Sequence, residues 1–431
     1  MRWKTPLLLI AGAIGCANGD ANNGVTPFDA QSFEGGADAF DDASRDATPQ
    51  DTQSTFDVDL DARVNAGPLD PDAACASTAV TAKAEALPVD IIWVVDNSAS
   101  MAPAVAQVKT GLNDFAAKIA AKSLDYKVIM LAIRNKTSPI TVSGGTRYPV
   151  CIPPPLAGDD NCGNGPRFFH TSVDIKSTQP LEQILGTLGQ TAGYKVGEAR
   201  GGDLTWADQL RKTATKTFVI VSDDNSRLSA DDFEHFKGGT NPFNSNMLPP
   251  GILDPSWKPI TGGFDGYLFS GLYGWGSTTD PSVVCKYSDG TAPPSSGSTY
   301  TTLVTKTGGV RAKICDGASA WGPFFEAIAS AVVKTAKLAC DLEIPVPASG
   351  TLDPSSVNVQ IDAGGTKELI PKVKDAASCG TAVGWYYDDD AAPKRVFLCP
   401  AACAKANAAV GIDKPGKIEV LFGCKTVTVI K

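Results

Sequence analysis

The pattern of apolar and polar residues along the chain changes most abruptly at residue 96. Residues 91–95 (Ile-Ile-Trp-Val-Val) form an unbroken apolar run, which is the pattern of a strand buried on both faces. Asp96, Ser98 and Ser100 follow at alternate positions, and over residues 105–119 apolar side chains recur three and four positions apart, as in an amphipathic helix. In wound α/β sheets, ligands bind at the carboxyl ends of strands. The sequence therefore predicts three oxygen-bearing side chains where such a fold has its binding site.

Further apolar patterns predict alternating strands and helices. Strands are expected at residues 126–133, 168–175, 217–221, 266–272 and 310–315, and helices at residues 181–188, 206–213 and 324–333. This alternation is typical of a doubly wound, mostly parallel α/β sheet. The aromatic-rich stretch at residues 263–275 is compatible with a partner surface, but the core of a strand or insertion is the favoured interpretation.

The sequence pattern changes after Cys340. Short β-type runs separated by Gly and Pro occur at residues 342–346, 357–361, 369–373, 385–387, 396–398 and 418–422. Cys379, Cys399, Cys403 and Cys424 lie in the same segment. We expect residues 340–431 to form a small, disulfide-rich β domain, and it contains no functional motif that we recognise.

The amino terminus has the features of an export signal. Arg2 and Lys4 precede a short apolar run, which predicts a signal peptide over residues 1–15, too short to span a membrane. Gly15 directly before Cys16 resembles the cleavage box of bacterial lipoproteins, which implies a lipid on Cys16. The alternative is an ordinary signal peptide cut near this cysteine.

The segment that follows is acidic and without apolar period. Residues 17–74 contain 13 acidic residues against Arg45 and Arg63, so we expect residues 16–74 to be the lipidated cysteine and a disordered linker. A calcium-binding role for the acidic run is the less favoured alternative to a solvated spacer. The whole chain has a net charge of −9, so the folded part is nearly neutral. Nothing in this charge distribution indicates nucleic acid.

The cysteine count supports export. Of 11 cysteines, setting Cys16 aside leaves ten, an even set typical of disulfides in an oxidising compartment. We favour the pairs Cys151–Cys162, Cys285–Cys315 and Cys75–Cys340, and the pairing among Cys379, Cys399, Cys403 and Cys424 stays open. Zinc is disfavoured because Cys399 and Cys403 lack a second pair at metal spacing and the chain has only two histidines, His170 and His235.

The Asp96-x-Ser98-x-Ser100 motif, with a strand before it and a helix after it, resembles the metal-ion-dependent adhesion site of von Willebrand factor A domains. Ala99 stands where that family usually has Gly. The family also has a threonine in a Gly-rich loop and an aspartate at the end of the fourth strand, and the resemblance assigns these roles to Thr205 and Asp223. Ser177, Thr178 and Thr191 compete for the threonine role. The resemblance implies a von Willebrand A-type domain, which we place at residues 75–339.

These five residues form an oxygen-only ligand set. Such ligands suit a hard divalent cation, Mg²⁺ first, or Mn²⁺ or Ca²⁺. Few charged ligands leave the ion electrophilic and one position open, and in the family an acidic side chain of a partner fills that position.

The expected function is therefore metal-dependent binding of a protein or other acidic ligand, displayed on the bacterial envelope by the lipid anchor alone. The expected location is the outer membrane, with the folded part either in the periplasm or on the cell surface. A structural lipoprotein with an idle metal site is one alternative. The other, an exported hydrolase using Ser98 or Ser100, is disfavoured because no Gly-x-Ser-x-Gly elbow is present; we expect no enzyme.

Overall fold

The computed structural model describes residues 78–81, 86–191, 194, 205–335, 337–344, 352–411, 414–422 and 426–428. All of them belong to the unit formed by residues 65–431. The expected signal peptide, Cys16 and the acidic linker lie outside these ranges, as do Cys75, Cys424 and the glycines at 201 and 202. Within the described ranges, no helix has both the length and the apolar character that crossing a bilayer requires.

Six parallel strands form the central sheet of an α/β domain. They are β2 (Val89–Val95), β3 (Tyr126–Ala132), β6 (Phe168–Ser172), β7 (Thr215–Val221), β10 (Leu268–Tyr273) and β11 (Arg311–Lys313). Their order across the sheet is β11-β10-β7-β2-β3-β6. β2 therefore lies between β7 and β3, with parallel neighbours on both sides. The expected mostly parallel α/β sheet is present.

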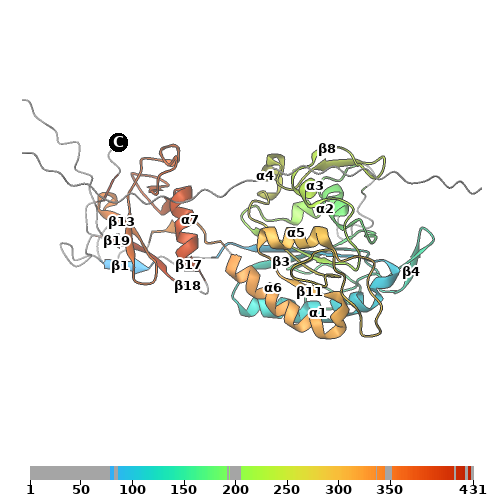
Figure 1. Cartoon of the computed structure of the whole chain (residues 1–431). Helices are drawn as coiled ribbons and strands as arrows, with labels where there is room; N and C mark the ends of the chain where they lie inside the picture. Colours follow the sequence, from blue (N-terminus) through green and yellow to red (C-terminus); the bar gives the residue numbers. More distant parts are fainter. Residues whose placement is uncertain are drawn as a thin grey trace, which may run out of the picture. The chain divides into compact units, whose positions relative to one another are not determined.

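Helices cover both faces of this sheet (Figure 1). They are α1 (Ala102–Ala121) and α6 (Trp321–Thr335) on one face, and α2 (Pro180–Leu188), α3 (Ala230–His235) and α5 (Ser298–Thr307) on the other. Because side chains alternate along a strand, Trp93 of β2 packs against α1 and α6, with ring centroids 5.4 Å from Phe115 and 5.9 Å from Phe325. Ile92 and Val94 belong to the opposite core. All seven side chains of β2 are buried, which confirms a strand covered on both faces.

Most of the expected elements of this domain are present, but the helix expected at residues 206–213 is wrong. Only the 3-10 turn η2 (Ala207–Gln209) forms there. The backbone N–H of Arg211 donates to Asp90 at 2.7 Å. This bond holds Arg211 near the start of β2, and residues 211–214 connect from there to the start of β7 without forming a helix. The aromatic stretch is core: Phe264, Tyr267 and Phe269 are buried.

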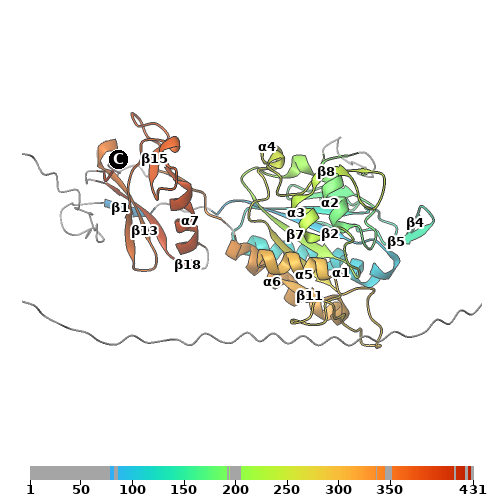
Figure 2. The ribbon, with the colours of Figure 1, turned by 45° about the horizontal axis from the view of Figure 1, so that its top comes forward.

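Insertions decorate the domain outside the sheet. The hairpins are β4 (Ile140–Val142) with β5 (Gly145–Arg147), and β8 (Lys237–Thr240) with β9 (Met247–Pro250). The first hairpin follows the carboxyl end of β3 and projects from the domain (Figure 2). η3 (Pro255–Trp257) and α4 (Lys258–Thr261) follow β9. These connections add loops without interrupting the sheet.

The carboxyl-terminal segment forms two antiparallel sheets and one helix. The first sheet contains β13 (Val357–Asp362), β14 (Lys367–Ile370) and β19 (Lys417–Phe422), and the second contains β12 (Asp341–Glu343), β15 (Trp385–Tyr387) and β16 (Arg395–Leu398). β17 (Val410–Gly411) pairs with β18 (Lys414–Pro415). The sequence pattern missed the helix α7 (Pro400–Ala409), in which buried Ala402 and Ala406 face the core. The six small alanines of this helix give no apolar period strong enough to reveal it.

β1 (Thr78–Thr81) belongs to this carboxyl-terminal sheet. It pairs antiparallel with β19, Thr78 opposite Phe422 and Thr81 opposite Glu419. The expected boundary had grouped residues 78–81 with the α/β domain. The α/β domain is thus inserted between β1 and β12 of the β domain. Between the two domains, Leu87 N–H donates to Lys337 O at 2.7 Å, so the two connecting segments are joined to each other.

Four disulfides are present among the described cysteines. Cys151–Cys162 and Cys285–Cys315 confirm the two expected local bridges. Cys340 pairs with Cys403, and Cys379 pairs with Cys399. The expected Cys75–Cys340 clasp is therefore wrong: Cys340 lies beside α7, where Cys403 in the first turn of that helix is its partner. An arrangement of this kind indicates an oxidising compartment.

We predict that peptide mapping under non-reducing conditions will recover Cys340 joined to Cys403 and Cys379 joined to Cys399. Among the ten cysteines after Cys16, Cys75 and Cys424 are then the remaining two, and an even set in an exported chain predicts that they are joined. Alkylation without prior reduction is the control. Labelling of Cys340 or Cys403 in that control would contradict the assignment.

Candidate functional site

Two neighbouring strands deliver the acidic residues of the candidate site. β2 and β7 run parallel in a register that sets Val95 opposite Val221. Asp96 and Ser222 follow directly, and Asp96 N–H donates to Val221 O at 3.0 Å. The Ser222 hydroxyl donates to one carboxylate oxygen of Asp96, Oδ2, at 3.0 Å. Asp223 is thereby placed beside Asp96 at the carboxyl edge of the sheet.

The two serines of the motif complete one side of this cluster. Ser98 N–H donates to Asp96 Oδ1 at 2.8 Å, which closes the turn after β2. The hydroxyls of Ser98 and Ser100 are 3.4 Å apart, and the Ser100 hydroxyl is close enough to Asp223 to hydrogen-bond with its carboxylate. Asp96 and Asp223 are buried, whereas Ser98 is half-buried and Ser100 is exposed. The site is thus acidic at its base and lined with hydroxyls where it opens to solvent.

Asn97 holds the turn after β2 through hydrogen bonds of its side chain and backbone. The sequence analysis did not single out this residue. Its side-chain oxygen accepts from Ile133 N–H, and its amide donates to Tyr148 O, both at 2.8 Å. Its own N–H donates to Ile175 O at 2.9 Å. One fully buried amide therefore ties the motif to the segments that follow β3 and β6.

The carboxylates of the site have unusual protonation behaviour. Burial raises the pKa of Asp96 to about 6, with the charge of Asp223 adding to the rise, while hydrogen bonds from Ser98 and Ser222 oppose it. Burial also raises the pKa of Asp223, and the Ser100 hydroxyl partly opposes this. Among the described residues, Asp223 Oδ1 has no hydrogen-bond partner although it is buried. Two adjacent buried carboxylates with a free oxygen are unfavourable unless protons or a cation neutralise them.

Two tyrosines of the surrounding elements face this charge. Tyr300 of α5 is fully buried behind the site, and this burial, followed by the nearby charge of Asp96, raises its pKa. Tyr287 lies in the loop that the Cys285–Cys315 bridge fixes, and its burial, followed by the charge of Asp223, raises its pKa. Neither residue carried a sequence signal, because each is brought to the site by an element far away in the chain.

Thr205, by contrast, is not brought to this cluster. Its hydroxyl donates to Asp208 at 2.9 Å. Trp206 donates to Thr187 at the end of α2, and Gln209 accepts from Lys127 at the start of β3. These contacts place the Thr205 segment with the amino ends of the strands, at the opposite edge of the sheet. The choice of Thr205 relied on its position before a helix that does not form.

Ser177 and Thr178 lie at the correct edge. The Ser222 hydroxyl, which bonds Asp96, also lies 3.4 Å from Ser177 O, and Thr178 O accepts from Arg227 N–H at 3.0 Å. Both residues are half-buried and directly precede α2, with Pro180 in its first turn. The third competitor, Thr191, contacts Gly186 near the end of α2. Ser177 and Thr178 therefore lie with Asp96, Ser98, Ser100 and Asp223 at the carboxyl ends of the strands.

The ligand types limit the chemistry of the site. In the described ranges, no three His, Cys, Asp or Glu side chains come together as a metal-binding group. The cluster instead combines two carboxylates with hydroxyls, a set suited to a hard cation with oxygen ligands. His170 is buried, with its pKa lowered to about 3 mainly by burial, and His235 belongs to α3.

Comparison with known proteins adds little to this geometry. No protein-family model and no curated protein matches the chain. Among solved structures, the chain is similar to the pilus adhesin SpaC from Lactobacillus rhamnosus GG, with 13% identity and a TM-score of 0.28 over 81% of this chain and 41% of that one. The open conformation of that adhesin gives 14% identity and a TM-score of 0.27, covering 81% and 40%. The chain thus spans well under half of the adhesin, and similarity at this level carries no argument about function.

The raised pKa of Asp96 predicts how stability depends on pH. The Asp96 carboxyl binds its proton more tightly in the folded state than in the unfolded chain. Protonation of Asp96 therefore stabilises the fold at low pH, and this contribution is lost as the pH rises through about 6. For EDTA-treated protein, we expect the free energy of unfolding to fall by up to about 3 kcal/mol between about pH 4 and pH 7.5. Urea unfolding at several pH values measures it.

Asp96→Asn is the matched control, because it keeps the shape of the side chain and removes its titration. Its stability profile should be flatter than that of the wild type over the same range. Parallel profiles for the two proteins would show that Asp96 does not titrate as its burial indicates.

Proposed function

We propose that this chain is a metal-dependent binding module of the bacterial envelope, with a von Willebrand A-type site formed by Asp96, Ser98, Ser100 and Asp223. The observation that carries the proposal is the meeting of two buried carboxylates, one of them with an unpartnered oxygen, beneath two serine hydroxyls. A divalent cation neutralises the carboxylates and accepts the hydroxyls as ligands. Thr178 replaces Thr205 in this proposal.

Mg²⁺ is the preferred ion, with Mn²⁺ or Ca²⁺ as substitutes. Mg²⁺ favours six oxygen ligands and dehydrates reluctantly, so it is commonly held by one or two carboxylates together with water. Asp96 and Asp223 supply those carboxylates here. A site with so few charges leaves the cation electrophilic toward a further oxygen ligand.

The exposed side of the site indicates where a partner would bind. Ser100 is exposed and Ser98 half-buried, whereas both carboxylates lie beneath them. A carboxylate from a protein or another acidic ligand would complete the cation's coordination from this side. The motif's resemblance to metal-ion-dependent adhesion sites supports the same direction of approach. We propose no catalytic step.

Export and anchoring complete the proposal. The four disulfides indicate an extracellular or envelope location. The Gly15-Cys16 sequence supports a lipid anchor, with residues 17–74 as the linker that carries the folded domains. The acidity of the linker keeps it solvated.

The metal and its ligands can be tested by titration. We expect calorimetric titration of EDTA-treated protein to show one Mg²⁺ or Mn²⁺ site, and the double substitution Ser98→Ala with Asp223→Ala to abolish it. We expect the metal-free double variant to keep the circular dichroism spectrum of the wild type, because a buried carboxylate without a cationic partner contributes little to the stability of a metal-free fold. Envelope proteins retained on the immobilised wild type should be released by EDTA and should not be retained by the double variant.

Asp224→Ala is the matched control, because it removes a neighbouring carboxylate whose Oδ1 already accepts from Asn225 N–H at 2.8 Å. This variant should bind metal as the wild type does. Wild-type protein without measurable Mg²⁺ or Mn²⁺ affinity would leave the site idle and support a structural role instead.

Two single substitutions test which threonine, Thr178 or Thr205, is a ligand of the metal. Thr178→Val and Thr205→Val each remove one hydroxyl at nearly constant volume. Because Thr178 lies at the carboxyl edge of the sheet and Thr205 does not, we expect Thr178→Val to weaken Mg²⁺ binding about tenfold, roughly the effect of one lost ligand contact of 1.4 kcal/mol. Thr205→Val should leave the affinity unchanged. The reverse result would restore Thr205 as the ligand.

A further inference from the structure

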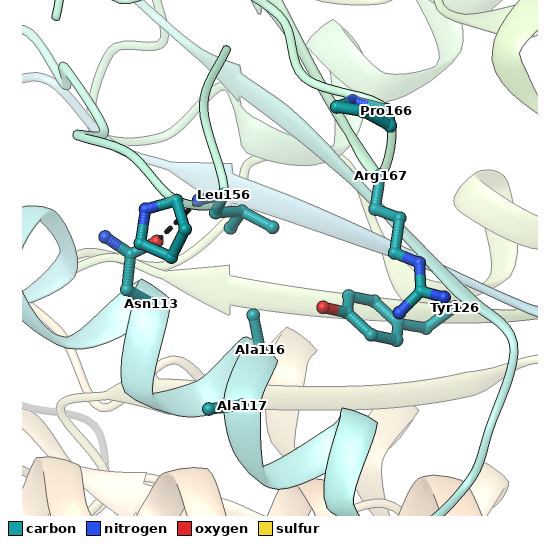
Figure 3. Close-up of a pocket in the computed structure, with 8 residues that line it drawn as sticks. Asn113, Ala116, Ala117, Tyr126, Leu156, Pro166 and Arg167 are labelled. Carbon is teal, nitrogen blue, oxygen red and sulfur yellow. Dashed lines mark hydrogen bonds between the residues drawn. The ribbon is translucent and has the colours of Figure 1, made fainter. Parts of the chain in front are cut away.

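A cavity lies beside α1, and none of its lining residues belongs to the acidic cluster (Figure 3). Its volume is about 340 Å³, at the lower end of the range for small-molecule sites. α1, the start of β3 and the segment before β6 supply its walls. It is lined by Asn113, Ala116, Ala117, Tyr126, Pro155, Leu156, Pro166 and Arg167. The two alanines, three and four residues after Asn113, leave the space that longer side chains would fill.

The walls of this cavity are fixed before any ligand binds. The side-chain amide of Asn113 donates to Pro153 O and Pro154 O, both at 3.1 Å, and its oxygen accepts from Leu156 N–H at 3.0 Å. The Cys151–Cys162 bridge closes the same loop. A wall held by three hydrogen bonds and a disulfide loses little conformational entropy when a ligand binds.

Two polar side chains of the cavity, Arg167 and Tyr126, are donors without a hydrogen-bond partner in the described part of the chain. The Arg167 guanidinium lies over the Tyr126 ring, 5.0 Å from its centroid. Stacking uses the face of the guanidinium and leaves its N–H groups, which lie in the plane, free to donate. In Figure 3 the Tyr126 hydroxyl points into the cavity toward Leu156 and Ala116. No hydrogen bond of this hydroxyl, and no acidic partner of Arg167, occurs among the described residues.

We propose that this cavity binds a small carboxylate with an apolar body, of the size of an N-acylated leucine. The carboxylate would pair with the guanidinium of Arg167 and accept from the Tyr126 hydroxyl, since arginine recognises carboxylates through two parallel hydrogen bonds. The apolar body would pack on Ala116, Leu156 and Pro155. A cation such as a protonated amine is disfavoured, because the cavity's only charged lining residue is itself a cation.

This cavity is chemically independent of the proposed metal site. Its ligand would bind to cationic and apolar groups, whereas the acidic cluster would bind a cation. Binding at the cavity should therefore persist in EDTA and in the Ser98→Ala, Asp223→Ala double variant. Failure of one proposal leaves the other standing.

The test is a chemical-shift titration of the full mature chain with N-acetyl-leucine, following the Arg167 Nε–H and the Tyr126 ring signals. N-acetyl-leucinamide, which lacks the carboxylate, is the ligand control. A short peptide ending in leucine, with a free or amidated carboxyl terminus, distinguishes a chain end from a free small molecule. We expect saturable shifts with the carboxylates, and at least about tenfold weaker binding with the amides.

Three variants sharpen the test. Arg167→Gln should weaken binding by a similar factor, while Lys122→Gln, which removes an exposed cation just after α1, should not. Ala117→Phe fills the cavity from an exposed helix position and should abolish binding without disturbing the core. Equal binding of acid and amide, or unchanged binding in Arg167→Gln and Ala117→Phe, would overturn the proposal.

Discussion

The parallel pairing of β2 with β7 is the interaction on which the rest of the structure depends. It joins residues more than 120 positions apart and sets Val95 opposite Val221, so that two carboxylates arrive at one edge of the sheet. Packing makes this register firm, because β2 is buried on both faces and a shift by one residue would exchange its two apolar faces. The same burial that fixes the strands removes water from Asp96 and Asp223. The sheet therefore brings the two carboxylates together and makes their joint ionisation unfavourable unless a proton or a cation neutralises them.

Buried acidic side chains have different partners at the amino and carboxyl edges of this sheet. At the amino edge, buried Asp90 is fully paired: Arg211 donates to it at 2.7 and 2.8 Å, and Lys216 lies 3.7 Å away. At the carboxyl edge, Asp96 and Asp223 have hydroxyl and amide partners but no cationic side chain in the described residues. An acid with such partners stabilises a fold, whereas a pair of acids without them is more typical of a site that awaits a ligand.

The inserted position of the α/β domain connects this site to the rest of the molecule. β1 precedes the domain and pairs with β19, which follows it, so both ends of the domain return to the same β sheet. Leu87 and Lys337 are hydrogen-bonded where the two connections meet. The α/β domain is therefore joined to the β domain by two connecting segments that are hydrogen-bonded to each other.

The sequence by itself determined the strand of residues 91–95, the helix after it, most of the alternation that follows and the two short-range disulfides. These features depend on local periodicity and on short loops. It also predicted that Asp96 and Asp223 end two buried strands, and the pairing of those strands brought the two side chains together. Only the tertiary structure decided the rest. The separation of Thr205 from the acidic cluster depends on which edge of the sheet its loop reaches, and β1 and Cys340 find partners that are distant in sequence. Distances across a fold are set by packing between elements, and no local pattern encodes them.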